Sequence, residues 1–149
     1  MASNPTPKRH LPMEGAYNIR DIGGYPIESG GNTRWKTFLR SDTMHRLTSN
    51  DQTMLLAYGV RTAIDLRTSM AAEEQPNVFE DSSEVSYVRY NIIGDEPTPE
   101  SEFVETALPA ERIRRSYTRW LDMRQGVFRQ TLALLADPAA RPVVYHCAG

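Results

Sequence analysis

The sequence contains one cysteine, which excludes an internal disulfide and fits a reducing compartment such as the cytoplasm. It has three histidines, His10, His45 and His146, and no second cysteine at ligand spacing, so we expect no metal site. The N-terminal stretch MASNPTPKRHLPMEG has no apolar core segment, and we therefore expect neither a secretory signal nor a membrane anchor in it. The single cysteine is left as a free thiol whose purpose must be explained.

An excess of positive charge is also lacking. With 17 Lys and Arg against 19 Asp and Glu, the net charge of -2 gives no reason to expect a nucleic acid as the partner. The length of 149 residues fits one domain. We expect residues 1–16 to be a flexible tail and residues 17–149 to form the folded domain.

The first half of the chain predicts a short strand, a helix and a second strand. WKTFLRS, residues 35–41, is typical of a strand, and Thr48 followed by Asp51 predicts a capping box at a helix start. Gly59 follows at the position of a left-handed C-cap. The helix is expected to turn three side chains inward: Met54, Leu55 and Tyr58.

Strand patterns continue at residues 60–66 and 85–93, where β-branched residues are dense. Residues 109–137 change to helical periodicity, which fits two amphipathic helices or one helix interrupted at Gly126. An apolar strand-length run then covers residues 141–147. Helices alternating with strands in this order predict an α/β sheet with helices packed on it.

The cysteine stands in the last seven residues, VVYHCAG, at the end of this final strand. A nucleophilic thiolate needs its pKa lowered, and backbone N–H groups in a loop of small residues after a strand form an anion nest that does so. Ala148 and Gly149 supply the small residues, and His146 offers hydrogen bonds behind the loop. The alternative from these residues alone is that Cys147 is a small buried hydrophobe.

Ordered motifs along residues 17–149 resemble one protein family. HCAG at residues 146–149 resembles the opening of the cysteine phosphatase signature His-Cys-x5-Arg. The other matches are NIRDIGG at 18–24, Arg40-Ser41, Leu47-Thr48 and GVRTAIDLR at 59–67. The chain is therefore similar to the tyrosine phosphatase family that includes bacterial dual-specificity and phosphoinositide-active members.

The resemblance implies a phosphotyrosine phosphatase-like sheet flanked by helices and a phosphocysteine mechanism without cofactor or metal. It implies that Cys147 attacks phosphorus and that Cys147, Ala148 and Gly149 begin the phosphate-binding loop, or P-loop. His146 would orient this loop. The further supporting or substrate-binding residues would be Arg20, Asp21, Arg40, Asp65 and Arg67, with Asp65 and Asp21 as fallback general acids; each of these five could instead form only ion pairs at strand ends.

One departure from the family pattern is that the signature arginine would fall four positions beyond Gly149. We therefore expect an N-terminal portion of a longer protein that ends inside its catalytic loop, lacks the C-terminal helices of the domain and is inactive alone. The alternatives are a pseudophosphatase or fragment acting as a binding module and, ranked lower, a rhodanese-like sulfurtransferase or an arsenate reductase.

The substrates implied by the resemblance are a phosphorylated protein or a phosphoinositide. The sequence does not decide between phosphotyrosine, phosphoserine or phosphothreonine, and phosphoinositide, nor does it give the oligomeric state. The enzyme is expected in the cytoplasm.

Overall fold

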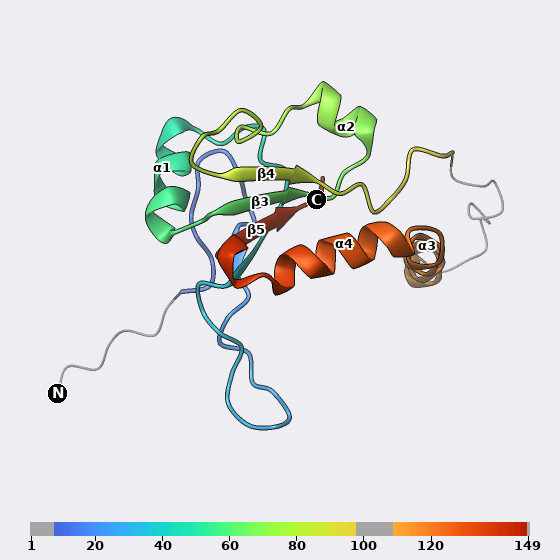
Figure 1. Ribbon diagram of the computed structural model, residues 1–149, viewed down its shortest axis with the longest axis horizontal. Coiled ribbons are helices and arrows are strands. Elements are labelled where there is room, and N and C mark those ends of the chain that lie inside the picture. Colours follow the sequence, from blue (N-terminus) through green and yellow to red (C-terminus); the bar gives the residue numbers. More distant parts are fainter. Residues whose placement is uncertain (1–7, 98–108, 149) are drawn as a thin grey trace.

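The computed structural model describes residues 8–97 and 109–148, which form a five-stranded sheet flanked by helices (Figure 1). The strands are β1 (Arg20–Asp21), β2 (Phe38–Ser41), β3 (Thr62–Asp65), β4 (Ser86–Arg89) and β5 (Val143–His146). Their order across the sheet is β1-β2-β5-β3-β4. The strands β2, β5, β3 and β4 are parallel, and β1 pairs antiparallel with β2. The α/β class expected from the sequence is confirmed.

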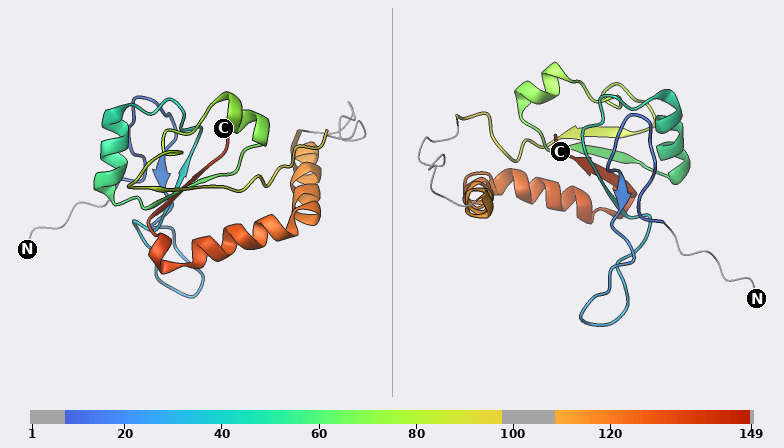
Figure 2. Two further views of the ribbon diagram at one scale, coloured as in Figure 1. Left: turned by 45° about the horizontal axis from the view of Figure 1, so that its top comes forward. Right: turned by 180° about the vertical axis from the view of Figure 1, so that it is seen from behind.

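The helices lie on opposite sides of this sheet (Figures 1 and 2). They are α1 (Ser49–Tyr58), α2 (Ser69–Glu74), α3 (Pro109–Met123) and α4 (Gln125–Ala136), followed by the short 3-10 helix η2 (Pro138–Ala140). α4 runs along one face, and α1 covers the other. α3 runs in a different direction from α4 and lies away from the sheet (Figure 2). Among the described residues, no helix combines the length and the apolar character that crossing a membrane requires.

Alternation along the central strands supplies both faces with apolar side chains. On the α1 side, Leu39, Ala63 and Val144 form one buried cluster with Leu55. On the α4 side, a second buried cluster contains Ile64, Ala140 and Val143, with Leu134 and Leu135 of α4 packed against it. All four residues of β3 are buried, because this strand lies inside the sheet and is covered on both faces.

The capping box predicted for the first helix is present. The Thr48 side chain accepts a hydrogen bond from the Asp51 backbone N–H, and the Asp51 side chain accepts one from the Thr48 backbone N–H. Gly59 closes the helix in the left-handed conformation, with φ of 102°. Met54 was expected to point inward but is 39% exposed, because it lies on the outer side of α1.

Two boundaries differ from the sequence prediction. The long helical segment breaks at Arg124, between α3 and α4, and Gly126 lies inside the first turn of α4. The polar run after Thr68 contains α2, which the pattern of apolar residues did not indicate. Its helix start is local, since the Thr68 side chain accepts a hydrogen bond from the Ala71 backbone N–H.

The expected tail of residues 1–16 is only partly covered by the structure, because residues 1–7 lie outside the described residues. Leu11 and Ala16 are buried, and the Leu11 N–H donates to the Ile19 carbonyl at 2.9 Å. The Gly15 N–H donates to the Asp51 carboxylate at 2.8 Å. These contacts pack residues 11–16 against the domain.

Candidate active site

Four parallel strands end together at one edge of the sheet, which we call the carboxyl edge. Ser41, His146, Asp65 and Arg89 form one row across it, from β2 through β5 and β3 to β4. Cys147 follows β5, the strand in the middle of the sheet, and the C-terminal end of the chain lies at this edge (Figure 1). Ligands of open α/β sheets bind outside the carboxyl ends of the strands. The topology therefore brings the one cysteine to the edge where a ligand site is expected.

Asp65 and Arg67 form a buried ion pair at this edge. The Arg67 Nη2 donates to Asp65 Oδ2 at 2.6 Å, and its Nε donates to Oδ1 at 2.9 Å. The Arg67 backbone N–H also donates to Oδ1, at 3.0 Å. Arg67 is 1% exposed and Asp65 is fully buried. The Asp65 carboxylate thus accepts hydrogen bonds from both the side chain and the backbone of Arg67.

Tyr87 of β4 is a third partner of the Asp65 carboxylate. Its hydroxyl donates to Asp65 Oδ2 at 3.0 Å, and burial together with the Asp65 charge raises the pKa of Tyr87. Burial alone would raise the pKa of Asp65, but the hydrogen bonds that the carboxylate accepts from the Arg67 side chain and backbone outweigh burial and hold this pKa below its usual range. Asp65 is therefore ionised at neutral pH.

His146 is fully buried directly before the cysteine, and both ring nitrogens have a partner. Nδ1 lies 3.3 Å from the Cys147 carbonyl oxygen, and Nε2 lies 2.8 Å from the Asn77 side-chain amide nitrogen. Burial lowers the pKa of His146; Asp65 opposes this shift, whereas Arg67 and Arg40 add to it. The imidazole is accordingly neutral at pH 7.

The loop after β5 begins with a half-buried Cys147 and an exposed Ala148. Cys147 is the free cysteine of the chain. Gly149, which the sequence assigns to the phosphate-binding loop, lies outside the described residues. The nucleophile candidate is thus partly accessible at the carboxyl edge, with the His146 ring buried behind it.

Arg20 and Arg40 pair with each other in the register of β1 and β2. Arg40 Nη1 donates to the Ser41 carbonyl, and its guanidinium lies over the Tyr145 ring, 5.8 Å from the centroid. The Arg20 Nη1 donates to the Asn18 carbonyl at 3.0 Å. By strand alternation, Arg40 and Tyr145 point to the α4 side, whereas Asp65 and His146 point to the α1 side. Both arginines are half-buried and lie on the other face from the Asp65–Arg67 pair.

Asp21 holds a turn away from the carboxyl edge. Its carboxylate accepts hydrogen bonds from the Gly23 N–H and the Lys36 N–H, both at 2.7 Å, and from the Tyr58 hydroxyl at 2.5 Å. Burial and the Asp21 carboxylate raise the pKa of Tyr58. Gly23 is needed in this turn because a Cβ there would lie 2.6 Å from the Trp35 Cα. The structure therefore does not bring Asp21 to Cys147.

A cavity of about 520 Å³ opens beside the residues that follow β3 and β4. Asp95, which follows β4, connects the two segments that line the cavity, because it accepts hydrogen bonds from the N–H and the hydroxyl of Ser69, which follows β3, both at 2.8 Å. Glu96 in turn pairs with Arg124, between α3 and α4, at 2.6 Å. Because β3 and β4 end at the carboxyl edge, this cavity lies at the same edge of the sheet as Cys147.

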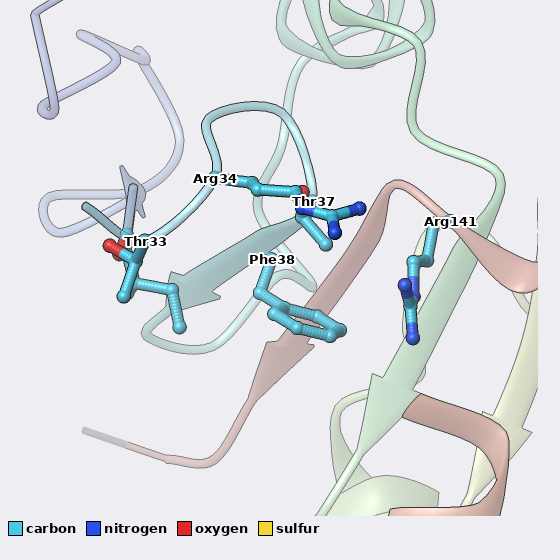
Figure 3. Close-up of a pocket in the computed structure, with 6 residues that line it drawn as sticks. Thr33, Arg34, Thr37, Phe38 and Arg141 are labelled. Carbon is cyan, nitrogen blue, oxygen red and sulfur yellow. The ribbon is translucent and has the colours of Figure 1, made fainter. Parts of the chain in front are cut away.

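A smaller cavity of about 280 Å³ lies at the opposite edge, where β2 and β5 begin (Figure 3). Figure 3 shows Arg34, Phe38 and Arg141 around it. Arg141 is already engaged, because its guanidinium donates to the Leu135 carbonyl at 2.9 Å and lies over the Phe38 ring, 5.4 Å from the centroid. This cavity is separated from Cys147 by the length of β5.

Sequence reasoning missed two residues of the carboxyl edge, Asn77 and Tyr87. Asn77 comes from a polar stretch between α2 and β4, and Tyr87 stands in a strand without any motif. Only the strand pairing and the loop path place them beside Asp65 and His146. In residues 8–97 and 109–148, no group of three or more His, Cys, Asp or Glu side chains could hold a metal ion.

Comparison with known proteins gives two findings. The model of the tyrosine phosphatase family matches residues 11–149. A tyrosine-protein phosphatase of Nostoc commune is 29% identical over 110 residues, which cover 74% of this chain and 37% of that protein. The chain thus spans about a third of the length of this curated relative.

Proposed function

The chain belongs to the tyrosine phosphatase family, and from this we propose that it carries the nucleophile of a phosphoric monoester hydrolase that works through a phosphocysteine at Cys147. The observation that carries the proposal is the position of the one cysteine. It follows the central strand of the sheet at the carboxyl edge, and the buried His146 lies directly before it. The comparisons support this chemistry over that of a sulfurtransferase.

The proposed reaction has two displacements at phosphorus. In the first, the Cys147 thiolate forms an S–P bond while the P–O bond to the leaving alcohol breaks, and the alcohol takes up a proton. In the second, water attacks phosphorus and loses a proton, the S–P bond breaks, and inorganic phosphate leaves with the thiolate restored. Backbone N–H groups of the loop at Ala148 and Gly149 would stabilise the equatorial oxygens.

The supporting residues are proposed in the same scheme. His146 would orient the loop through the Cys147 carbonyl. Asp65 and Arg67 would support the loop after β5 from inside the domain, because they are buried and paired with each other. An ionised Asp65 cannot donate a proton to the leaving group, so we assign it no general-acid role. The role of Arg20 and Arg40 as cations that bind the substrate remains a prediction.

We propose a phosphorylated protein as the substrate, with tyrosine or dual specificity, and a phosphoinositide as the alternative. Both present a phosphate monoester to the same nucleophile. The single cysteine supports a cytoplasmic site of action, since free thiols persist in reducing compartments.

The test is hydrolysis of p-nitrophenyl phosphate by the 149-residue chain and by the complete product of its gene. Cys147→Ser is expected to lower turnover of the active form by at least about 1,000-fold, because it removes the group that forms the covalent intermediate. Ser83→Ala is the control, since this exposed residue lies in the loop before β4, at the other end of the sheet. Its turnover should equal that of the wild type.

Capture of the intermediate completes the experiment. Rapid quenching with a phosphorylated substrate is expected to add one phosphoryl group to the peptide that contains Cys147, as seen by mass spectrometry. Turnover that survives Cys147→Ser would contradict the proposal. Absence of turnover in both forms, combined with binding of a phosphopeptide, would instead identify a binding module.

A further inference from the structure

The hydrogen bonds around His146 determine which ring nitrogen carries the proton. Nδ1 lies 3.3 Å from the Cys147 carbonyl oxygen, which can only accept a hydrogen bond. Nδ1 must therefore be the donor. The ring proton thus points at the backbone of the residue that bears the thiol.

The other nitrogen, Nε2, faces the Asn77 side chain, and the orientation of this amide is fixed independently. Asn77 Oδ1 accepts a hydrogen bond from the Phe79 N–H at 2.9 Å, so the amide nitrogen is the atom that lies 2.8 Å from Nε2. An amide nitrogen can only donate. Nε2 must therefore present its lone pair, and a proton on it would face the N–H group of Asn77. Asn77 is 4% exposed, which keeps water from replacing this contact.

The charges around the ring do not by themselves favour this arrangement. The Asp65 Oδ2 lies 3.6 Å from Nε2 and attracts a proton to that nitrogen. Arg67 and Arg40 oppose protonation of the ring, and the Tyr87 hydroxyl donates to the same Asp65 Oδ2. Without the Asn77 donor, the nearest charged group would draw the ring proton away from Nδ1, and Nδ1 would then repel the Cys147 carbonyl.

We propose that Asn77 is a positioning residue for the nucleophile: its amide keeps the proton of His146 on Nδ1, and this proton fixes the backbone of Cys147 at the start of the loop. The proposal rests on the proposed function for its catalytic meaning. The positions of Asn77, His146 and Cys147 relative to one another do not depend on the proposed function, because they follow from the contacts between these three residues. Asn77 acts through His146 and is not placed in contact with the substrate.

The first measurement is the protonation of His146 in the wild-type chain, by nitrogen-15 NMR of its ring nitrogens between pH 5.5 and 8. We expect a protonated Nδ1 and a bare Nε2 at pH 7 and above. A proton on Nε2 at pH 7 would overturn the proposal, and this result needs neither a variant nor catalytic turnover.

The second measurement uses Asn77→Asp, which keeps the acceptor for the Phe79 N–H and replaces the donor toward Nε2 by a carboxylate oxygen. We expect Nε2 to become protonated and His146 to become a cation. Iodoacetamide alkylation of the single cysteine should then shift its pH midpoint downward by about 0.5 unit or more, because a nearby cation favours the thiolate. Asn50→Asp makes the same change at an exposed position of α1 and should leave the midpoint in place.

An Asn77→Asp ring spectrum identical to that of the wild type would overturn the proposal. The two hypotheses fail in different ways. If turnover survives Cys147→Ser while the ring spectra are as expected, the phosphocysteine mechanism is wrong and Asn77 still orients the loop. If Cys147→Ser abolishes turnover but the wild-type Nε2 is protonated, the enzyme mechanism stands and the role of Asn77 is wrong.

Discussion

At the scale of single residues, Asp65 and Arg67 show how a sequence motif acquires its meaning. IDLR places the two charges at the end of a strand, where substrate contact and ion pairing are both possible. The structure shows that they bind each other in a buried pair, with Tyr87 as a third partner. Removal of one member leaves the other as an unpaired buried charge, which is far more costly than losing an exposed salt bridge.

We therefore predict that Arg67→Met lowers the free energy of unfolding by about 3–5 kcal/mol, because Asp65 keeps its burial and loses its cation. Urea denaturation followed by circular dichroism measures this change. Arg61→Met is the matched control, because Arg61 is exposed, and it should stay within about 0.5 kcal/mol of the wild type. Equal effects of the two substitutions would show that the pair is not a structural support.

At the scale of elements, α1 begins at the position that the sequence predicts from its capping box. The capping box uses Thr48 and Asp51, which are local in the chain. The structure adds a second role that the local pattern does not contain, since the Asp51 carboxylate also accepts hydrogen bonds from the Glu14 and Gly15 N–H groups at 2.9 and 2.8 Å. One side chain thus starts the helix and anchors the N-terminal segment to it.

The second prediction separates these two roles. Thr48→Ala removes one cap acceptor and should cost about 0.5–2 kcal/mol of unfolding free energy. Asp51→Asn should cost more than Thr48→Ala, because the new amide turns a donor toward N–H groups that need an acceptor, at about 1–3 kcal/mol for each one left unsatisfied. Thermal denaturation of both variants, beside the exposed Asp81→Asn, gives the comparison; a smaller loss in Asp51→Asn than in Thr48→Ala would refute the anchoring role.

At the scale of the whole molecule, three buried titratable groups, Asp51, Asp65 and His146, act in the same direction on stability as the pH falls. Hydrogen bonds from Glu14, Thr48 and Gly15 outweigh burial and hold the pKa of Asp51 low, as those from Arg67 do for Asp65. Burial lowers the pKa of His146. In each case the unfolded chain binds protons more readily than the folded one, so stability falls as the pH falls.

The third prediction follows from this sign. Between pH 7.5 and 5.5, the melting temperature should decrease as the unfolded state gains a proton at His146, whose ordinary pKa is about 6.5. A further decrease should begin near pH 4, where the two carboxylates of the unfolded chain take up protons. Calorimetric scans measure the profile, and His146→Gln should flatten its upper part alone. A melting temperature that stays constant from pH 7.5 to 5.5 in the wild type would contradict the neutral buried imidazole.

The limits of sequence reasoning are visible in particular residues. The capping box, Gly59 and the final strand were predicted because they depend on neighbours within a few positions. α2 was missed because its six residues are too few to show a helical period. Asn77 was missed because its partner His146 is 69 positions away, and nothing in the polar run around it indicates a partner.

The sequence by itself determined the α/β class, the family and the identity of the one thiol, since these depend on composition, periodicity and ordered motifs. Only the tertiary structure decided that Asp65 and Arg67 neutralise each other, that Asp21 holds a turn and that Asn77 faces His146. The physical reason is that a hydrogen bond needs two groups within about 3 Å. Strand register and burial, set by packing across the whole chain, determine which groups meet at that distance.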